Sequence, residues 1–395
     1  MLSSCMLACV TPAALALDPS KSPSQYVLNT WQLAEGLPQN SPLSITQTPD
    51  GYLWIGTQEG LARFDGVRFT VFDRRNTPQI RSNIMTALHA DRRGRLWVGT
   101  TAGVVLLDRQ RRFSFIGDGS ALATTTVYAI TEDRRGALYF ATEAGLFEYL
   151  NGALSRLALE EGVSDTSIRT ARIDREGVMW VATAARGLYR LAEGAGAHVA
   201  LPGEETPAVS AIHEDADGTL WLGTEKGQLY RSTATGFARV HAAAHLDASV
   251  RALLRDRDGN LWVGSIGGGL LRIRGAGVSV ETSSSARASE PGPRAGAHDA
   301  RDHARNDERA RMRSAFDVLE AGAVPTTDIR ALYEDVEGNL WAGSYGGGLL
   351  RLRDGKFTPF GVPEGLPGNL AWTIAPSADG GLWVGTDAGL SRYRA

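Results

Sequence analysis

The chain has 395 residues, of which 43% are hydrophobic, and its formal net charge is −3. A chain of this length predicts two or three domains by default, and its near-neutral charge argues against a nucleic-acid-binding surface, which normally carries a basic stripe. The two cysteines, Cys5 and Cys9, lie at the N-terminus, so the rest of the chain offers neither a disulfide framework nor a cysteine metal site.

The first residues resemble an export signal. They form an uncharged apolar run that ends in Ala14-Leu15-Ala16, a small-x-small pattern, and the sequence then turns polar. The usual Lys/Arg start is missing. We expect residues 1–17 to be a signal peptide and the mature chain to be periplasmic or secreted; a disordered N-terminus is the alternative. No later stretch approaches 18 continuous apolar residues, so no membrane span is expected.

A short motif then recurs along the chain, first as GYLWIGT and last as GGLWVGT. Repeats of this kind identify repeat architectures. The aromatic residues of the eight copies lie 41 to 43 residues apart, except for one interval of 79 residues, and are Trp54, Trp97, Tyr139, Trp180, Trp221, Trp262, Trp341 and Trp383.

Each repeat unit contains four strand-like segments. In the first unit they are 43–48, 52–57, 61–65 and 68–72, with Asp-Gly turns at Asp50-Gly51 and Asp65-Gly66. Asp-Gly between such segments is a strong hairpin signal, and four short antiparallel strands in about 42 residues make one propeller blade. We therefore predict an all-β fold, a β-propeller. The aromatic residue of each unit is expected to pack between blades, and the glycine after it lets neighbouring backbones approach.

The two ends of the chain indicate how the ring closes. The eighth unit stops after its third strand, and residues 25–38 parallel residues 356–367. We expect residues 18–395 to form a single domain of about eight four-stranded blades, closed by the N-terminal strand pairing with the last blade, because closure removes open sheet edges. Seven blades with one unit displaced is the alternative.

The string GLPQNSPLSITQTPDGYLWIGTQEGLARFDG resembles the two-component-regulator propeller repeat. This resemblance implies a periplasmic sensor region of the type found in hybrid histidine kinases and some diguanylate cyclases, many of which sense carbohydrates. Members place the propeller before a β-sandwich, a membrane span and a signalling module, and we expect none of these within these 395 residues. We expect a truncated sensor or a stand-alone binding protein that acts with a membrane-bound signalling partner.

One position varies while its neighbours stay small or apolar. Eight residues before each turn glycine the chain has Leu43, Thr86, Tyr128, Arg169, Ser210, Arg251, Arg330 and Trp372. We expect this position near the mouth of the central channel. Arginine binds carboxylate or sulfate groups through a planar fork of donors, and aromatic faces stack on sugar rings. The predicted ligand is therefore a saccharide or anionic oligosaccharide, bound by Tyr128, Arg169, Arg251, Arg330 and Trp372. The alternative is a solvent-facing column whose arginine stems cover apolar surface.

Two other features belong to the same predicted face. The links between the second and third strands form a second candidate ring of Gln58, Glu59, Glu143, Arg186, Glu225, Lys226, Tyr345 and Asp387. Residues 283–314 are rich in Ala, Arg, Asp, Ser and Gly, and we expect them to be a disordered insertion.

Two rival functions remain open: a propeller enzyme similar to streptogramin or polysaccharide lyases, and a protein-docking scaffold that uses the rim. A lyase needs a general base, often a histidine. Only His89 and His213 lie on predicted inner strands, and we expect both to be structural. We expect no catalytic residues, no metal and no cofactor, and therefore a ligand-binding sensor and not an enzyme.

Overall fold

The computed structural model describes residues 17–18, 21, 25–159, 167–192, 195–203, 206–240, 248–274, 316–318, 327–355, 360–362, 365–377 and 381–393. Residues 1–16 of the predicted export signal and the predicted insertion at 283–314 lie outside these ranges. Leu17, the last residue of the predicted signal, is buried in a core cluster with Tyr26 and Trp262.

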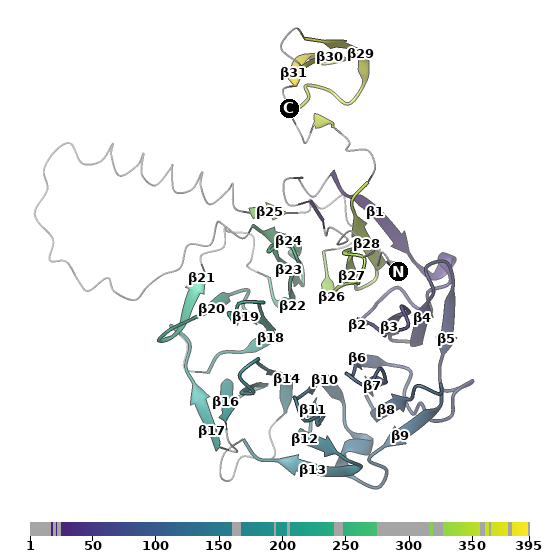
Figure 1. The fold of residues 1–395 in the computed structure, drawn as a ribbon, viewed down its shortest axis with the longest axis vertical. Coiled ribbons are helices and arrows are strands. Elements are labelled where there is room, and N and C mark those ends of the chain that lie inside the picture. The colour runs from purple at the N-terminus through teal and green to yellow at the C-terminus, as the bar shows by residue number, and fades with distance from the viewer. Residues whose placement is uncertain are drawn as a thin grey trace, which may run out of the picture.

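The fold is all-β, and seven four-stranded antiparallel sheets surround a common centre (Figure 1). The first four blades consist of β2 (Ser44–Gln47), β3 (Leu53–Thr57), β4 (Gly60–Phe64) and β5 (Phe69–Phe72); β6 (Met85–Ala90), β7 (Leu96–Thr100), β8 (Gly103–Leu107) and β9 (Phe113–Ile116); β10 (Val127–Glu132), β11 (Leu138–Thr142), β12 (Gly145–Leu150) and β13 (Ala153–Leu157); and β14 (Ile168–Ile173), β15 (Met179–Thr183), β16 (Leu188–Ala192) and β17 (Ala195–Val199).

The remaining three blades of the ring consist of β18 (Val209–Glu214), β19 (Leu220–Thr224), β20 (Leu229–Thr233) and β21 (Gly236–Val240); β22 (Val250–Arg255), β23 (Leu261–Ser265), β24 (Gly269–Ile273) and β25 (Phe316–Val318); and β26 (Ile329–Glu334), β27 (Leu340–Ser344), β28 (Gly348–Arg353) and β1 (Val27–Trp31). The helical elements are two 3₁₀ turns in the described ranges, η2 (Leu33–Glu35) and η3 (Ala121–Thr124).

The inner strands show where the ring closes. Each inner strand packs against that of the next blade, and β26 of the seventh blade packs against β2 of the first. At this junction a Cβ on Gly343 would lie only 2.7 Å from the carbonyl oxygen of Pro42. The glycine after the repeat aromatic therefore permits close approach between the last and first blades, as predicted.

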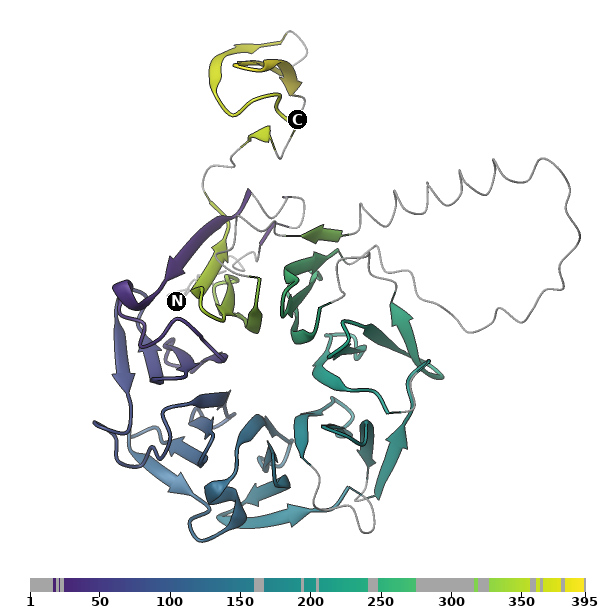
Figure 2. The same ribbon diagram turned by 180° about the vertical axis from the view of Figure 1, so that it is seen from behind.

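The predicted ring of eight blades is wrong. The N-terminal strand β1 pairs with β28 of the seventh unit, with Thr30 opposite Leu350, and not with the eighth unit. That unit forms a separate three-stranded sheet of β29 (Ala371–Pro376), β30 (Leu382–Thr386) and β31 (Gly389–Tyr393), which lies outside the ring (Figures 1 and 2). The structure matches the seven-blade alternative.

The similarity between the N-terminal segment and the segment before the eighth unit, which suggested the eight-blade closure, also explains why that prediction failed. Residues 25–38 and 356–367 are alike because each suits the outer position of a blade, and only one segment can occupy the edge of β28. The strand β1 takes it, and Trp31 stacks on Trp341 at 5.3 Å and meets Phe64 edge-on at 5.3 Å. This aromatic contact joins the seventh blade to the first.

The repeat aromatics are packing residues, as predicted. In the seven blades of the ring they are at most 9% exposed, whereas Trp383 of the displaced unit is 37% exposed. In five blades the indole Nε1 donates to an aspartate of the preceding turn, in the pairs Trp97–Asp91, Trp180–Asp174, Trp221–Asp215, Trp262–Asp256 and Trp341–Asp335. The turn and the core of each such blade are thereby tied together.

Candidate functional site

The variable position coincides with a backbone irregularity. The register between the first two strands shifts in every described unit after the first, and the residue left unpaired is Thr86, Tyr128, Arg169, Ser210, Arg251, Arg330 or Trp372. A β-bulge directs a side chain away from the ladder and is common beside functional sites. The bulge explains why this position varies while its neighbours, which face the core, do not.

The links between the second and third strands lie on the same face as the bulges. In each of these units the first link residue donates its N–H to the carbonyl two residues before the bulge, as Glu143 does to Thr126 and Tyr345 does to Asp328. Within the seven-blade ring, the members of the two predicted candidate rings therefore form one surface; Trp372 and Asp387 belong to the displaced sheet. The hairpin turns between first and second strands, and between third and fourth, lie on the opposite face.

Two of the five predicted ligand residues contact each other. The guanidinium carbon of Arg169 lies 5.3 Å from the centre of the Tyr128 ring, across the junction between the third and fourth blades. Arg169 is exposed and Tyr128 is half-buried. Stacking on the ring leaves the guanidinium edge free to donate hydrogen bonds.

Arg251 and Arg330 are joined to acidic neighbours instead. Arg251 lies 3.8 Å from Glu225 of the adjacent blade, and Arg330 donates to Asp328 at 3.0 Å while lying 4.0 Å over the Tyr345 ring. Glu225 and Tyr345 belong to the second predicted ring. The sequence predicted both rings on one face; the Arg251–Glu225 contact depends on how neighbouring blades meet, whereas the Arg330–Tyr345 contact forms within the seventh blade.

The structure places the fifth predicted residue elsewhere. Trp372 lies on β29 of the displaced sheet and is 74% exposed. It shares the bulge position but not the ring, so the structure does not bring it together with Tyr128, Arg169, Arg251 and Arg330.

The same position serves packing in two other blades. The single O–H of Thr86 is shared between the carbonyls of Gly99 and Val127, and that of Ser210 is shared between those of Gly223 and Val250. Val127 and Val250 belong to the following blades. Thr86 and Ser210 therefore join neighbouring blades through backbone carbonyls, whereas Arg169 and Arg251 contact side chains of neighbouring blades.

The two inner-strand histidines lie between neighbouring blades. His213 Nε2 accepts the N–H of Arg255 at 3.0 Å, and His89 lies 3.6 Å from Glu132. Burial lowers the pKa of both side chains; for His213, with added repulsion from Arg172 and Arg255, the pKa falls to about 3. Their contacts are those of structural residues.

We expect His213 to make the fold sensitive to acid. Its pKa falls from 6.5 to about 3 on folding, so its contribution to stability is full above pH 6.5 and is lost as the pH drops toward 3. The loss is up to about 1.4 kcal/mol per pH unit; Asp215, whose pKa burial raises, acts in the opposite direction. Urea unfolding between pH 5 and pH 7.5 should show a shallower pH dependence in His213→Gln than in the native chain. If the free energy of unfolding changes equally steeply with pH in both proteins, His213 is not the source of the acid sensitivity.

Sequence and structure comparisons agree with this architecture. The family model described as the two-component regulator propeller matches residues 36–59, 79–102, 203–226, 246–267, 323–346 and 365–388. The chain contains six two-component regulator propeller repeats. Among curated proteins, histidine kinase P4 of Formosa agariphila is 36% identical over 70 residues, which are 18% of this chain and 5% of the kinase.

Solved structures with the same fold come from different functional classes. The extracellular domain of a putative hybrid two component system of B. thetaiotaomicron has a TM-score of 0.65 and 20% identity, and the match covers 94% of this chain and 53% of that one. A virginiamycin B lyase of Staphylococcus aureus has a TM-score of 0.61 and 13% identity, and the match covers 85% of this chain and 100% of the lyase. The regulator propeller thus spans about half of the solved extracellular domain. No helix in the described ranges has the length and apolar character of a membrane span.

Proposed function

We propose that this regulator propeller is the ligand-binding part of a two-component signalling system, that it acts outside the cytoplasm, and that it binds a saccharide or anionic oligosaccharide without transforming it. The repeat family and the propeller fold of a hybrid two component system's extracellular domain support the signalling role. The binding surface is the face that carries the bulges.

The observation that carries the ligand class is the stack of Arg169 on Tyr128. Arg330 lies over Tyr345 on the same face three blades further along the ring, but its guanidinium is already paired with Asp328. An arginine positioned by a neighbouring ring can donate two parallel hydrogen bonds to a carboxylate or sulfate, and convergent polar groups are the usual form of a ligand site.

The test is a thermal-shift titration of the chain with oligogalacturonate and with a neutral cello-oligosaccharide. A ligand at 100 times its Kd should add about 2.7 kcal/mol to the free energy of unfolding. We expect stabilisation by the acidic sugar, and its loss when Arg169, Arg251 and Arg330 are all changed to alanine.

The charge control is Arg68→Ala with Arg134→Ala, two exposed arginines in turns of the opposite face. This double variant should keep the full shift. Stabilisation that survives in the triple variant, or no stabilisation by either sugar, would overturn the proposed site.

A further inference from the structure

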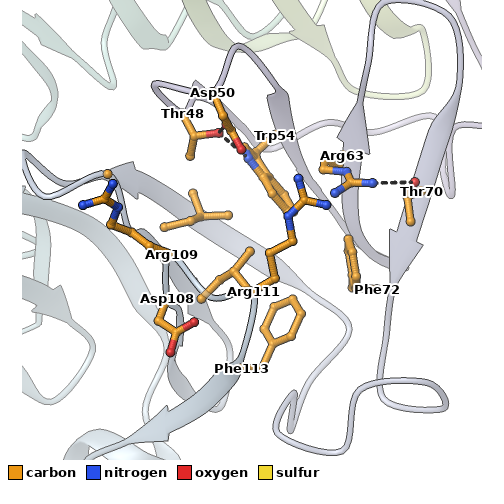
Figure 3. A pocket seen from close by; sticks show the side chains of 13 residues that line it. Thr48, Asp50, Trp54, Arg63, Thr70, Phe72, Asp108, Arg109, Arg111 and Phe113 are labelled. Atoms are coloured by element: carbon orange, nitrogen blue, oxygen red, sulfur yellow. Dashed lines mark hydrogen bonds between the residues drawn. The ribbon is translucent and has the colours of Figure 1, made fainter.

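A cavity of about 350 Å³ lies between the first and second blades, on the face opposite the bulges. It opens among the β2–β3 and β4–β5 hairpins of the first blade and the β8–β9 hairpin of the second. Its walls include Trp54, Phe72 and Phe113, and three arginines reach it, Arg63, Arg109 and Arg111 (Figure 3). Apolar walls with a few charged groups are the usual composition of a ligand pocket.

Two of the arginines converge from different blades. The guanidinium carbons of Arg63 and Arg111 lie 4.4 and 5.6 Å from the centre of the same Tyr52 ring. Figure 3 shows Arg111 extending from its turn toward Arg63 and Trp54. Neither arginine forms a salt bridge with a residue that the structure describes. Two cations brought onto one ring repel each other, and an anion between them would relieve that repulsion.

The acidic residues of the cavity are engaged elsewhere. Asp108 accepts from Nε and the backbone N–H of Arg112 at 2.9 and 2.8 Å, and these contacts hold the pKa of Asp108 below its usual value. Asp50 accepts a hydrogen bond from the Thr48 hydroxyl. Both carboxylates stabilise their own turns and keep their charge, and the lining combines them with three arginines, Arg63, Arg109 and Arg111, so its net charge is positive.

A comparison with the other blades shows what is special about the first. An arginine lies opposite the repeat tryptophan in five blades of the ring, in the pairs Trp54–Arg63, Trp180–Arg190, Trp221–Arg231, Trp262–Arg272 and Trp341–Arg351. In four of these blades the indole donates to a turn aspartate. In the first blade Trp54 donates to Thr48 Oγ1 at 2.9 Å. The first blade keeps the arginine and replaces the neighbouring carboxylate with a hydroxyl.

The turn that carries Arg111 has an unusual backbone. Arg111 has a φ of 62°, one of two positive values among non-glycine residues in the described ranges. Residues other than glycine adopt this conformation at a cost, and such residues cluster at functional sites. Here the conformation accompanies a side chain that extends over the cavity.

We propose that this cavity is a second binding site, for an anionic group such as a sulfate or carboxylate carried on a flat apolar or ring-shaped body. Arg63 and Arg111 hold the oxyanion, while Trp54, Phe72 and Phe113 contact the body. A neighbouring open cavity is lined by Arg92, Arg93 and Arg95 and shares Asp108 and Arg109 with the first. A ligand with a second anionic group extends into that cavity.

The test uses three probes of graded chemistry on the ¹⁵N-labelled chain: phenyl sulfate, inorganic sulfate and benzyl alcohol. The readout is the indole N–H resonance of Trp54, assigned by its absence in Trp54→Phe. We expect phenyl sulfate to shift it saturably, inorganic sulfate to bind at least tenfold more weakly, and benzyl alcohol to leave it unchanged.

Two variants locate the site. Thr48→Asp restores the residue type that four arginine-bearing blades have at this position, so it should fold while placing a carboxylate beside Arg63; it should weaken phenyl sulfate at least tenfold. Arg111→Gln changes an exposed turn residue and should have a similar effect, whereas Arg68→Gln in the β4–β5 turn should have none. Because the site is separate from the bulge face, the chain with Arg169, Arg251 and Arg330 changed to alanine should bind phenyl sulfate normally.

Three outcomes would overturn the proposal. They are the absence of a saturable shift with phenyl sulfate, affinities unchanged in both Thr48→Asp and Arg111→Gln, and equal affinities for phenyl sulfate and inorganic sulfate. The last would show that the aromatic walls contribute nothing to binding.

Discussion

Replacing Trp31 with alanine is expected to destabilise the ring by about 2–3 kcal/mol, somewhat less than for a fully buried tryptophan. Trp31 belongs to the N-terminal strand β1 and contacts Trp341 and Phe64, each at 5.3 Å. The substitution removes the aromatic contact that joins the seventh blade to the first and weakens the attachment of β1 to β28. Urea unfolding followed by far-UV circular dichroism measures the loss.

The matched control is Trp383→Ala in the displaced sheet. Trp383 occupies the repeat position but is 37% exposed, so its removal should change the main unfolding transition by no more than about 0.5 kcal/mol. Deletion of residues 356–395 should likewise leave that transition in place. If Trp383→Ala or the deletion costs as much as Trp31→Ala, the eighth unit belongs to the ring and the seven-blade closure is wrong.

The second large effect is expected at Asp256, with a loss of about 3–5 kcal/mol in Asp256→Ala. Asp256 is 5% exposed, and its carboxylate accepts from Trp262 Nε1 at 2.7 Å, Asn260 Nδ2 at 2.9 Å and Asn260 N at 2.8 Å. Alanine leaves these three buried donors without their acceptor.

Two variants at the same turn separate this network from a general charge effect. Asp258 is exposed, and Asp258→Ala should cost no more than about 0.5 kcal/mol. Asp256→Asn retains one acceptor oxygen and should fall between the two alanine variants. Equal unfolding midpoints for Asp256→Ala and Asp258→Ala would show that the turn does not depend on the carboxylate.

Much of the blade could be predicted from the sequence because its causes are local. Period-two strands and glycine turns define each hairpin, and the recurring tryptophan indicates the residue that packs between sheets. Gly343 illustrates the point: the repeat alone predicts a close backbone approach, and the structure places the Pro42 carbonyl there.

The candidate site could be predicted only in part. The variable column marked Tyr128 and Arg169, and the structure adds that this column is a bulge whose side chains leave the ladder. The convergence of Arg63 and Arg111 on Tyr52 was not predicted, because it depends on the contact between two hairpins of different blades. The only sign of this site in the sequence was Thr48, which stands where the following six units have a turn aspartate.

The sequence by itself therefore determined the repeat, the strands of each blade, the packing role of the tryptophans and the family. Only the tertiary structure decided which units join the ring and which side chains meet. The seventh and eighth units both carry the strand and glycine pattern of the repeat, and that pattern does not name the partner of β1. That choice follows from one edge on β28 and from the fit of Trp31 between Trp341 and Phe64, contacts that form only when the first and seventh blades come together.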